Sequence, residues 1–138
     1  MKYLAIDYGK KRTGLAVADD QTRIALPLEV IETSSDTERI RRIAEAIEDQ
    51  GVDALVLGLP LNMDGSEGPA SKGARQFSKR LAEAVGLTVH FVDERLTSHE
   101  AESVLRETGL SGRKTKTRRD AVAAAVILRD FLQKEAGK

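Results

Sequence analysis

The chain contains no cysteine, and this absence excludes several kinds of chemistry. Without thiols there is no disulfide framework, no thiolate nucleophile and no cysteine-based zinc site. The sequence also lacks a long apolar run and a signal-peptide pattern, so we expect a soluble, cytoplasmic protein with no membrane partner. Aromatic side chains are few, with two Tyr, three Phe and no Trp, which leaves little surface for stacking single-stranded bases.

The composition fits one globular domain spanning residues 1–138. Hydrophobic residues make up 41% of the chain and charged residues 32%, which is ordinary for a soluble protein. The 22 basic and 22 acidic residues cancel to a formal net charge of zero. This balance argues against a protein that coats polyanions indiscriminately, although a local basic patch can still bind nucleic acid.

Three short apolar runs near the N-terminus predict an antiparallel meander of strands at residues 3–8, 14–18 and 25–31. Pro27 in the third run suits an edge strand, because proline has no amide hydrogen to donate to a neighbour. Two later apolar runs, at residues 53–59 and 87–92, alternate with helical patterns and are typical of buried parallel strands.

Helices are predicted between and after these later strands. The first follows the cap candidates Ser34, Ser35 and Asp36 and ends at Gly51. Its buried apolar stripe consists of Ile40, Ile43, Ala44 and Ile47. The second buries Phe77 and Leu81 and ends at Gly86. Residues 60–69 are expected to form a loop, Thr97 to open a third helix, residues 108–117 to be a basic linker, and residues 120–133 to form the last helix.

This order of elements predicts an α/β fold with a five-stranded mixed sheet flanked by helices. The sheet would combine the three-strand antiparallel meander with two parallel strands, because helical crossovers make parallel neighbours. In such sheets ligands bind outside the carboxyl ends of the parallel strands. The residues that follow those strand ends are therefore the first candidates for a functional site.

Three carboxylates are expected to meet at this edge. Asp7 ends the first strand, Glu94 follows the last strand, and Asp120 begins the final helix, whose small alanines allow it to approach the sheet closely. Each acid alone also has a structural interpretation. Asp7 would shape a turn, Glu94 would pair with Arg95, and Asp120 would complement the dipole of its helix. Together they form an all-oxygen site, which suits Mg²⁺ or Mn²⁺ and not zinc.

Such a metal site needs no nucleophilic side chain, because two ions about 3.5–4 Å apart can activate water and stabilise the departing oxygen of a phosphodiester. Two runs of cations lie beside the acids and favour phosphate contact, although a run alone is usually a solvated face. The first is Lys10, Lys11 and Arg12, and the second contains Arg113, Lys114, Lys116, Arg118 and Arg119.

Four blocks of the sequence resemble the signature blocks of the YqgF family. They are DYGKKRTGLAVAD (7–19), GLPLNMDGSEGP (58–69), DERLTS (93–98) and RKTKTRRDAVAAAVIL (113–128). That family comprises Holliday junction resolvases that are also described as nucleases maturing the end of small-subunit ribosomal RNA. The resemblance spans essentially the whole chain and implies a ribonuclease H-like fold and a Mg²⁺- or Mn²⁺-dependent phosphodiesterase.

The resemblance also implies roles for single residues. It carries the catalytic and metal-binding roles to Asp7, Glu94 and Asp120, and it suggests that Asn62 contacts substrate. Asn62 and Asp64 alone would be turn residues, and His99 would be either a proton-transfer group or a surface residue. A junction resolvase needs two active sites, so that activity would imply a homodimer.

Two other functions remain open from the sequence. A nucleotide-binding or kinase module also uses an Asp-x-Gly hairpin, but those folds need two such domains and this chain has the length of one. A noncatalytic RNA-binding assembly factor on the same fold is the stronger alternative. It predicts RNA binding that is unaffected by removal of Mg²⁺ and no cleavage in any metal.

Overall fold

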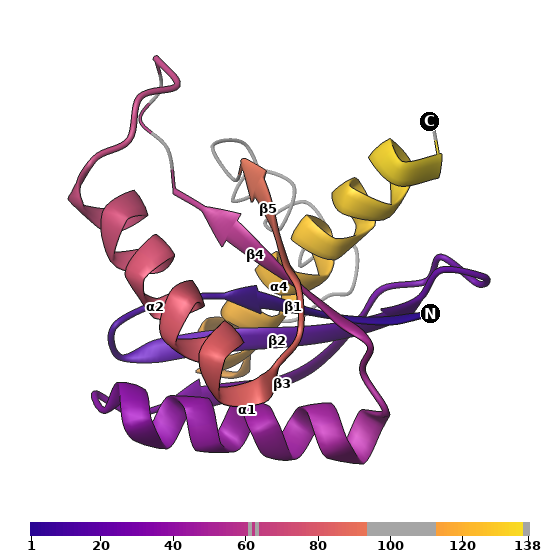
Figure 1. Ribbon diagram of the computed structural model, residues 1–138, viewed down its shortest axis with the longest axis horizontal. Helices are drawn as coiled ribbons and strands as arrows, with labels where there is room; N and C mark the ends of the chain where they lie inside the picture. The colour runs from indigo at the N-terminus through magenta and orange to yellow at the C-terminus, as the bar shows by residue number, and fades with distance from the viewer. Residues whose placement is uncertain (61, 63, 94–112, 137–138) are drawn as a thin grey trace.

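Five strands form one mixed sheet with helices on both faces (Figure 1). The computed structural model describes residues 1–60, 62, 64–93 and 113–136, with side chains of the last helix described over residues 121–134. The strands are β1 (Lys2–Asp7), β2 (Arg12–Asp19), β3 (Leu26–Glu32), β4 (Ala54–Leu59) and β5 (Val89–Asp93). The helices are α1 (Asp36–Gln50), α2 (Pro69–Val85) and α4 (Arg113–Ala136).

The strand order is β3-β2-β1-β4-β5, which confirms the predicted sheet. β1, β2 and β3 pair antiparallel, whereas β4 is parallel to β1 and β5 is parallel to β4. Pro27 lies on β3, an edge strand, as expected. The β2–β3 register shifts between Leu15 and Ala16, where Leu28 is an extra residue on the edge strand and forms a bulge.

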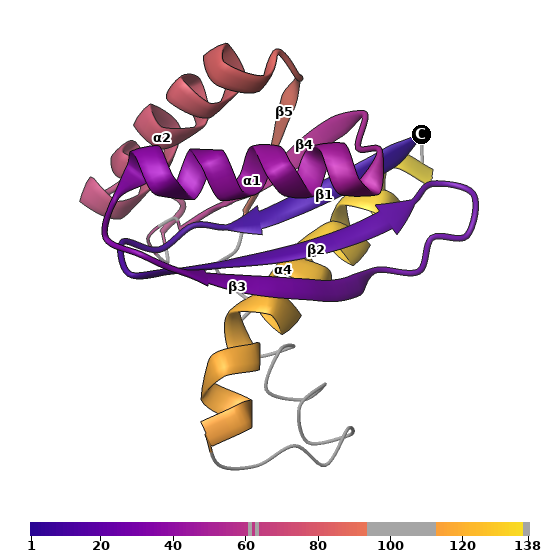
Figure 2. The same ribbon diagram turned by 90° about the horizontal axis from the view of Figure 1, so that it is seen from below.

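One face of the sheet is covered by α1 and α2 (Figure 2). Leu4 and Ile6 of β1 point to this face and belong to a core that includes Ile43 of α1 and Phe77 of α2. The predicted caps of α1 are confirmed, because the Ser35 side chain accepts a hydrogen bond from the Glu38 amide at 3.2 Å and Gly51 ends the helix at φ 66°.

The other face carries small side chains and is covered by α4. Tyr3 and Ala5 of β1 point to this face, as the strand alternation predicts. The alanines let the helix pack directly on the strands through its own buried stripe, which contains Ala124, Ile127, Leu128, Phe131 and Leu132. The ring centroids of Tyr3 and Phe131 lie 5.3 Å apart in an edge-to-face contact, so this part of α4 lies over the amino end of β1.

The prediction that the last helix begins at Asp120 is wrong, because α4 begins at Arg113. The segment that looked like a basic linker is therefore helical from that residue onward. Its residues are mainly lysine and arginine, whose helix propensities approach that of alanine, and no proline or glycine interrupts them. Asp120 consequently lies inside the helix and not in its first turn, so the helix-dipole explanation for this acid does not apply.

Some predicted features fall outside the described residues. The third helix expected from Thr97 and the acid Glu94 both belong to residues 94–112, which the structure leaves undescribed. Among the helices that are described, none is sufficiently long and apolar to cross a lipid bilayer.

A fully buried arginine joins the first hairpin to the helical layer. Arg39 of α1 donates from Nη2 to the backbone oxygens of Lys10 and Thr33, both at 2.6 Å. Its Nη1 pairs with Asp36. The guanidinium carbon lies 5.1 Å from the ring centroid of Tyr8, whose ring stacks on a phenylalanine of α2. This one side chain therefore fixes the turn after β1, the loop before α1 and the start of α1.

We expect Arg39→Met to destabilise the fold by roughly 2–4 kcal/mol, because it leaves two carbonyls without their donor and a carboxylate without its buried partner. The measurement is the free energy of unfolding in urea. Arg41→Met is the matched control, since Arg41 is on the same helix but is exposed and pairs only with surface glutamates. The control should unfold at nearly the wild-type urea concentration. Equal effects of the two substitutions would contradict the role of the buried guanidinium.

Candidate active site at the carboxyl edge of the sheet

The three parallel strands end at the same edge of the sheet. Ile6 of β1 pairs with Leu57 of β4, and Leu59 at the end of β4 pairs with Asp93 at the end of β5. Asp7 is the last residue of β1, so the predicted position of this carboxylate at a strand end is confirmed. Whatever follows β4 and β5 in the chain therefore starts beside Asp7, which is where this class of sheet binds ligands.

Asp7 lies between two glycines on the α4 face of the sheet. Gly14 of β2 is its paired residue, and Gly58 of β4 follows the Ile6–Leu57 pair by one position. Leu15 beside Gly14, and Leu57 and Leu59 on each side of Gly58, belong to the opposite core, so a side chain at either glycine would project onto the α4 face. Neither cross-strand neighbour of Asp7 therefore carries a side chain, and we call this pair of glycines beside the half-buried Asp7 the cradle.

The position of Asp120 in α4 agrees with the same edge. It lies one turn before Ala124, whose side chain is fully buried against the sheet. Position 120 is eleven residues before Phe131, or about 16 Å along the helix. Tyr3, which contacts Phe131, lies about 13 Å along β1 from Asp7. The two lengths are similar, and the approach of position 120 to Asp7 stays a prediction.

The structure describes only part of the predicted group of three acids. Glu94 lies outside the described residues, although β5 ends at Asp93, one residue before it. Val92 contributes to the core under α4, so alternation places Asp93 on the opposite face, as expected for an acid outside the site. Within the part of the chain that is described, no three His, Cys, Asp or Glu side chains form a group able to hold a metal. The shared metal site stays a prediction.

The predicted substrate-binding cations come from two elements. Lys10 and Lys11 lie in the β1–β2 turn and are exposed, and Arg12 begins β2 with its Nε 4.0 Å from Glu32. Arg113, Lys114, Lys116 and Arg118 belong to the first two turns of α4, on the same helix as Asp120. By helical periodicity, positions 113, 116 and 120 share one stripe, whereas positions 114 and 118 lie on another.

The loop that carries Asn62 is held together by hydrogen bonds from its own side chains. The Asn62 amide donates from Nδ2 to Ser66 Oγ at 3.0 Å, and Ser66 donates from its backbone and hydroxyl to Asp64 Oδ1. These contacts explain why an Asn-x-Asp-Gly-Ser segment forms this turn. The exposed Asn62 therefore has a structural role, and its predicted contact with substrate stays a prediction.

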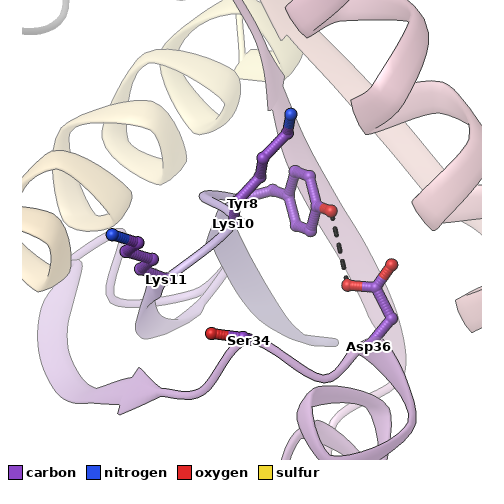
Figure 3. Close-up of a pocket in the computed structure, with 5 residues that line it drawn as sticks. All are labelled: Tyr8, Lys10, Lys11, Ser34 and Asp36. Atoms are coloured by element: carbon purple, nitrogen blue, oxygen red, sulfur yellow. Dashed lines mark hydrogen bonds between the residues drawn. The ribbon is translucent and has the colours of Figure 1, made fainter.

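A cavity of about 390 Å³ lies beside the β1–β2 turn, on the α1–α2 side of the sheet. We call it the hairpin cavity, and its lining residues are Tyr8, Lys10, Lys11, Ser34 and Asp36 (Figure 3). The Tyr8 hydroxyl donates to Asp36 Oδ1 at 3.3 Å. Burial, and then the negative charge of Asp36, raise the pKa of Tyr8, so this phenol stays protonated as a donor.

Sequence reasoning did not find the cradle or the hairpin cavity. Tyr8 was assigned to the first strand and Ser34 was only a cap candidate, whereas the structure places both around one hollow. Segments 14–18 and 53–59 are apolar at nearly every position, so their sequences do not indicate which face Gly14 and Gly58 share with Asp7. Their pairing with Asp7 required the strand register.

Solved structures define the class of fold. The chain is similar to Thermus thermophilus RuvC in complex with a Holliday junction substrate, with a TM-score of 0.60, 19% identity and coverage of 99% of this chain and 96% of that one. It is also similar to the Fowlpox virus resolvase bound to Holliday junction DNA, with a TM-score of 0.61, 12% identity and coverage of 98% and 99%. The fold is therefore the ribonuclease H-like fold of RuvC-type resolvases.

The sequence comparison identifies the family within this class. The family model described as "RuvX: Holliday junction resolvase" matches residues 1–134. A protein of Anaeromyxobacter sp. (strain Fw109-5), named "Putative pre-16S rRNA nuclease", is 48% identical over 132 residues, which cover 96% of each chain. A Chloroflexus aurantiacus protein of the same name is 41% identical over 129 residues, covering 94% of this chain and 84% of the relative. The chain belongs to the RuvX (YqgF) family.

We expect Gly58→Ala to weaken Mn²⁺ binding about tenfold or more without lowering stability, because the new methyl group would occupy the space beside the Asp7 carboxylate. Mn²⁺ affinity is measured by electron paramagnetic resonance, and stability by thermal unfolding. Gly73→Ala is the matched control, since Gly73 lies in α2 with no atom within 4 Å of an added β-carbon. A Gly58→Ala protein that binds Mn²⁺ as tightly as the control would disprove the cradle.

Proposed function

We propose that this chain is a divalent-metal-dependent endonuclease that hydrolyses nucleic-acid phosphodiesters at the carboxyl edge of its sheet. Its substrate would be precursor 16S ribosomal RNA, a Holliday junction, or both. Membership of the RuvX family and the names of its close relatives support a nuclease. The observation that carries the proposal is Asp7, a half-buried carboxylate at a strand end whose two cross-strand neighbours are glycines.

The donor set proposed for the metal is Asp7, Glu94 and Asp120. All three offer carboxylate oxygens, and the chain has no cysteine, which fits Mg²⁺ or Mn²⁺. When bound, these cations supply Lewis-acid activation of a water nucleophile and charge stabilisation for the departing oxygen. Two observations support this set: Asp7 ends β1 at the carboxyl edge of the parallel strands, and α4, the helix that contains Asp120, packs on the same sheet.

The cations of the β1–β2 turn and of α4 bind the backbone of the substrate in this proposal. A nucleic-acid backbone carries one negative charge per phosphate, and lysine and arginine side chains hold it in register over the acids. Lys10 and Lys11 lie three and four residues after Asp7, and the basic turns of α4 precede Asp120 directly. The substrate backbone would therefore be held by cations on both sides of the acids.

We expect Asp7→Asn to reduce cleavage at least about 100-fold, because it removes a metal ligand with little change in side-chain volume. The assay measures cleavage of a precursor 16S ribosomal RNA fragment and of a four-way DNA junction, each with Mg²⁺, with Mn²⁺ and with EDTA. Asp20→Asn is the matched control: it makes the same chemical change at an exposed residue that pairs with the N-terminus. The control should cleave like wild type.

Two results would contradict the proposal. Full activity of Asp7→Asn would show that this carboxylate does not serve the reaction. Binding of RNA that persists in EDTA, with no cleavage of either substrate by the wild-type protein in any metal, would instead favour the noncatalytic assembly factor. Cleavage of the junction at two symmetric sites, together with a dimer in analytical ultracentrifugation, would assign the junction as substrate and the homodimer as the active form.

A further inference from the structure

The hairpin cavity has the charge of an anion site. Lys10 and Lys11 line it, and neither forms an ion pair with a carboxylate in the part of the chain that is described. Figure 3 shows the two lysines extending from the turn in different directions, and the Tyr8 hydroxyl pointing to Asp36; Ser34 is the fifth lining residue. Its volume of about 390 Å³ lies in the range of small-ligand sites, about 300–1,000 Å³.

The one acid in the cavity is already neutralised. Asp36 pairs with the buried Arg39 and lies 3.5 Å from Nη1 of Arg80, and it also accepts the hydrogen bond from Tyr8. Two guanidinium groups thus face one carboxylate, and the two lysines add further positive charge. An anionic group entering the cavity would meet net positive charge, so a metal cation or a basic peptide is not the expected ligand.

The backbone under the lysines is held in place before any ligand arrives. The Lys10 oxygen accepts from Arg39 Nη2 at 2.6 Å, and the Lys11 oxygen accepts from the Thr33 amide at 3.0 Å. Gly9 completes the turn, since a β-carbon there would collide with the Arg12 carbonyl oxygen. A site built on a fixed backbone loses little conformational entropy on binding, which favours recognition over chance attraction.

We propose that the hairpin cavity binds neighbouring backbone phosphates of the nucleic-acid substrate, with Lys10, Lys11 and Ser34 as its contacts. This inference rests on the proposed nuclease function. Asp7 and Tyr8 are consecutive residues on opposite faces of the sheet, so the cavity and the candidate active site lie on the two sides of one turn. The bound nucleic acid therefore passes around the tip of the hairpin, and a duplex, with phosphates on two strands, contacts both sides.

The test is fluorescence anisotropy with a labelled duplex RNA, titrated with protein at several salt concentrations. All proteins carry Asp7→Asn, so that no cleavage occurs during the measurement. We expect Lys10→Gln and Lys11→Gln each to reduce the slope of log affinity against log salt by about 1, because each removes one phosphate contact. Ser34→Ala should weaken binding roughly threefold to tenfold with an unchanged slope, because it removes a hydrogen bond and no charge.

The matched control is Lys2→Gln, which removes the same charge at the amino end of β1, the other end of the strand. Its salt slope and affinity should equal those of the Asp7→Asn parent. Slopes for Lys10→Gln and Lys11→Gln equal to the control would overturn the proposal. Reduced slopes with no effect of Ser34→Ala would also overturn it, because the lysines would then attract RNA without using the cavity.

These results separate the cavity from the nuclease proposal. Binding that depends on Lys10, Lys11 and Ser34, in a protein whose wild type cleaves nothing, would uphold the cavity and reject the nuclease. Cleavage by wild type, with binding unchanged by the three substitutions, would uphold the nuclease and reject the cavity. Absence of duplex binding by the Asp7→Asn parent at any salt concentration would overturn the cavity proposal, whereas the nuclease proposal is decided by the cleavage assay.

Discussion

The structure depends on one guanidinium group buried between the sheet and its helices. Burying a charge is costly unless partners surround it, and Arg39 meets this requirement with two backbone oxygens, a carboxylate and an aromatic ring. Among the buried side-chain nitrogen and oxygen atoms of the described residues, only Arg39 Nε has no hydrogen-bond partner. Because those partners come from the β1–β2 turn and the β3–α1 loop, the charge fixes the geometry of the turn that follows Asp7. Stability of the core and placement of the candidate site are therefore linked through Arg39.

The two faces of the sheet are specialised by side-chain size. The face under α1 and α2 carries leucine and isoleucine, as in an ordinary apolar core. The face under α4 carries mainly alanine, and the side chains become glycine on both sides of Asp7. Small residues allow a helix to approach closely and then leave room for a ligand where the strand ends. The decrease in side-chain volume toward Asp7 thus accounts for both the close packing of α4 and the glycines of the cradle.

The sequence patterns predicted the mixed sheet, with its antiparallel meander and two parallel strands, and the caps of α1, because these follow from local periodicity and from rules of connection. Arg39 escaped prediction because it stands in a run of charges, Glu-Arg-Ile-Arg-Arg, and its acceptor at Lys10 is 29 residues away. The start of α4 was misplaced because a charge run was interpreted as a linker. Asp7 was located correctly at a strand end, whereas the glycines beside it required the register and the convergence with Glu94 stays a prediction.

The bulged, proline-containing strand β3 also limits how copies of the chain can associate. An edge strand with free amide hydrogens invites a second strand to add to it, which leads to extended sheets and aggregation. Pro27 removes one of these donors, and the extra residue Leu28 interrupts the regular ladder. Continuous sheet extension across this edge is therefore disfavoured. A symmetric pair of molecules would have to meet through helices, loops or the opposite border of the sheet.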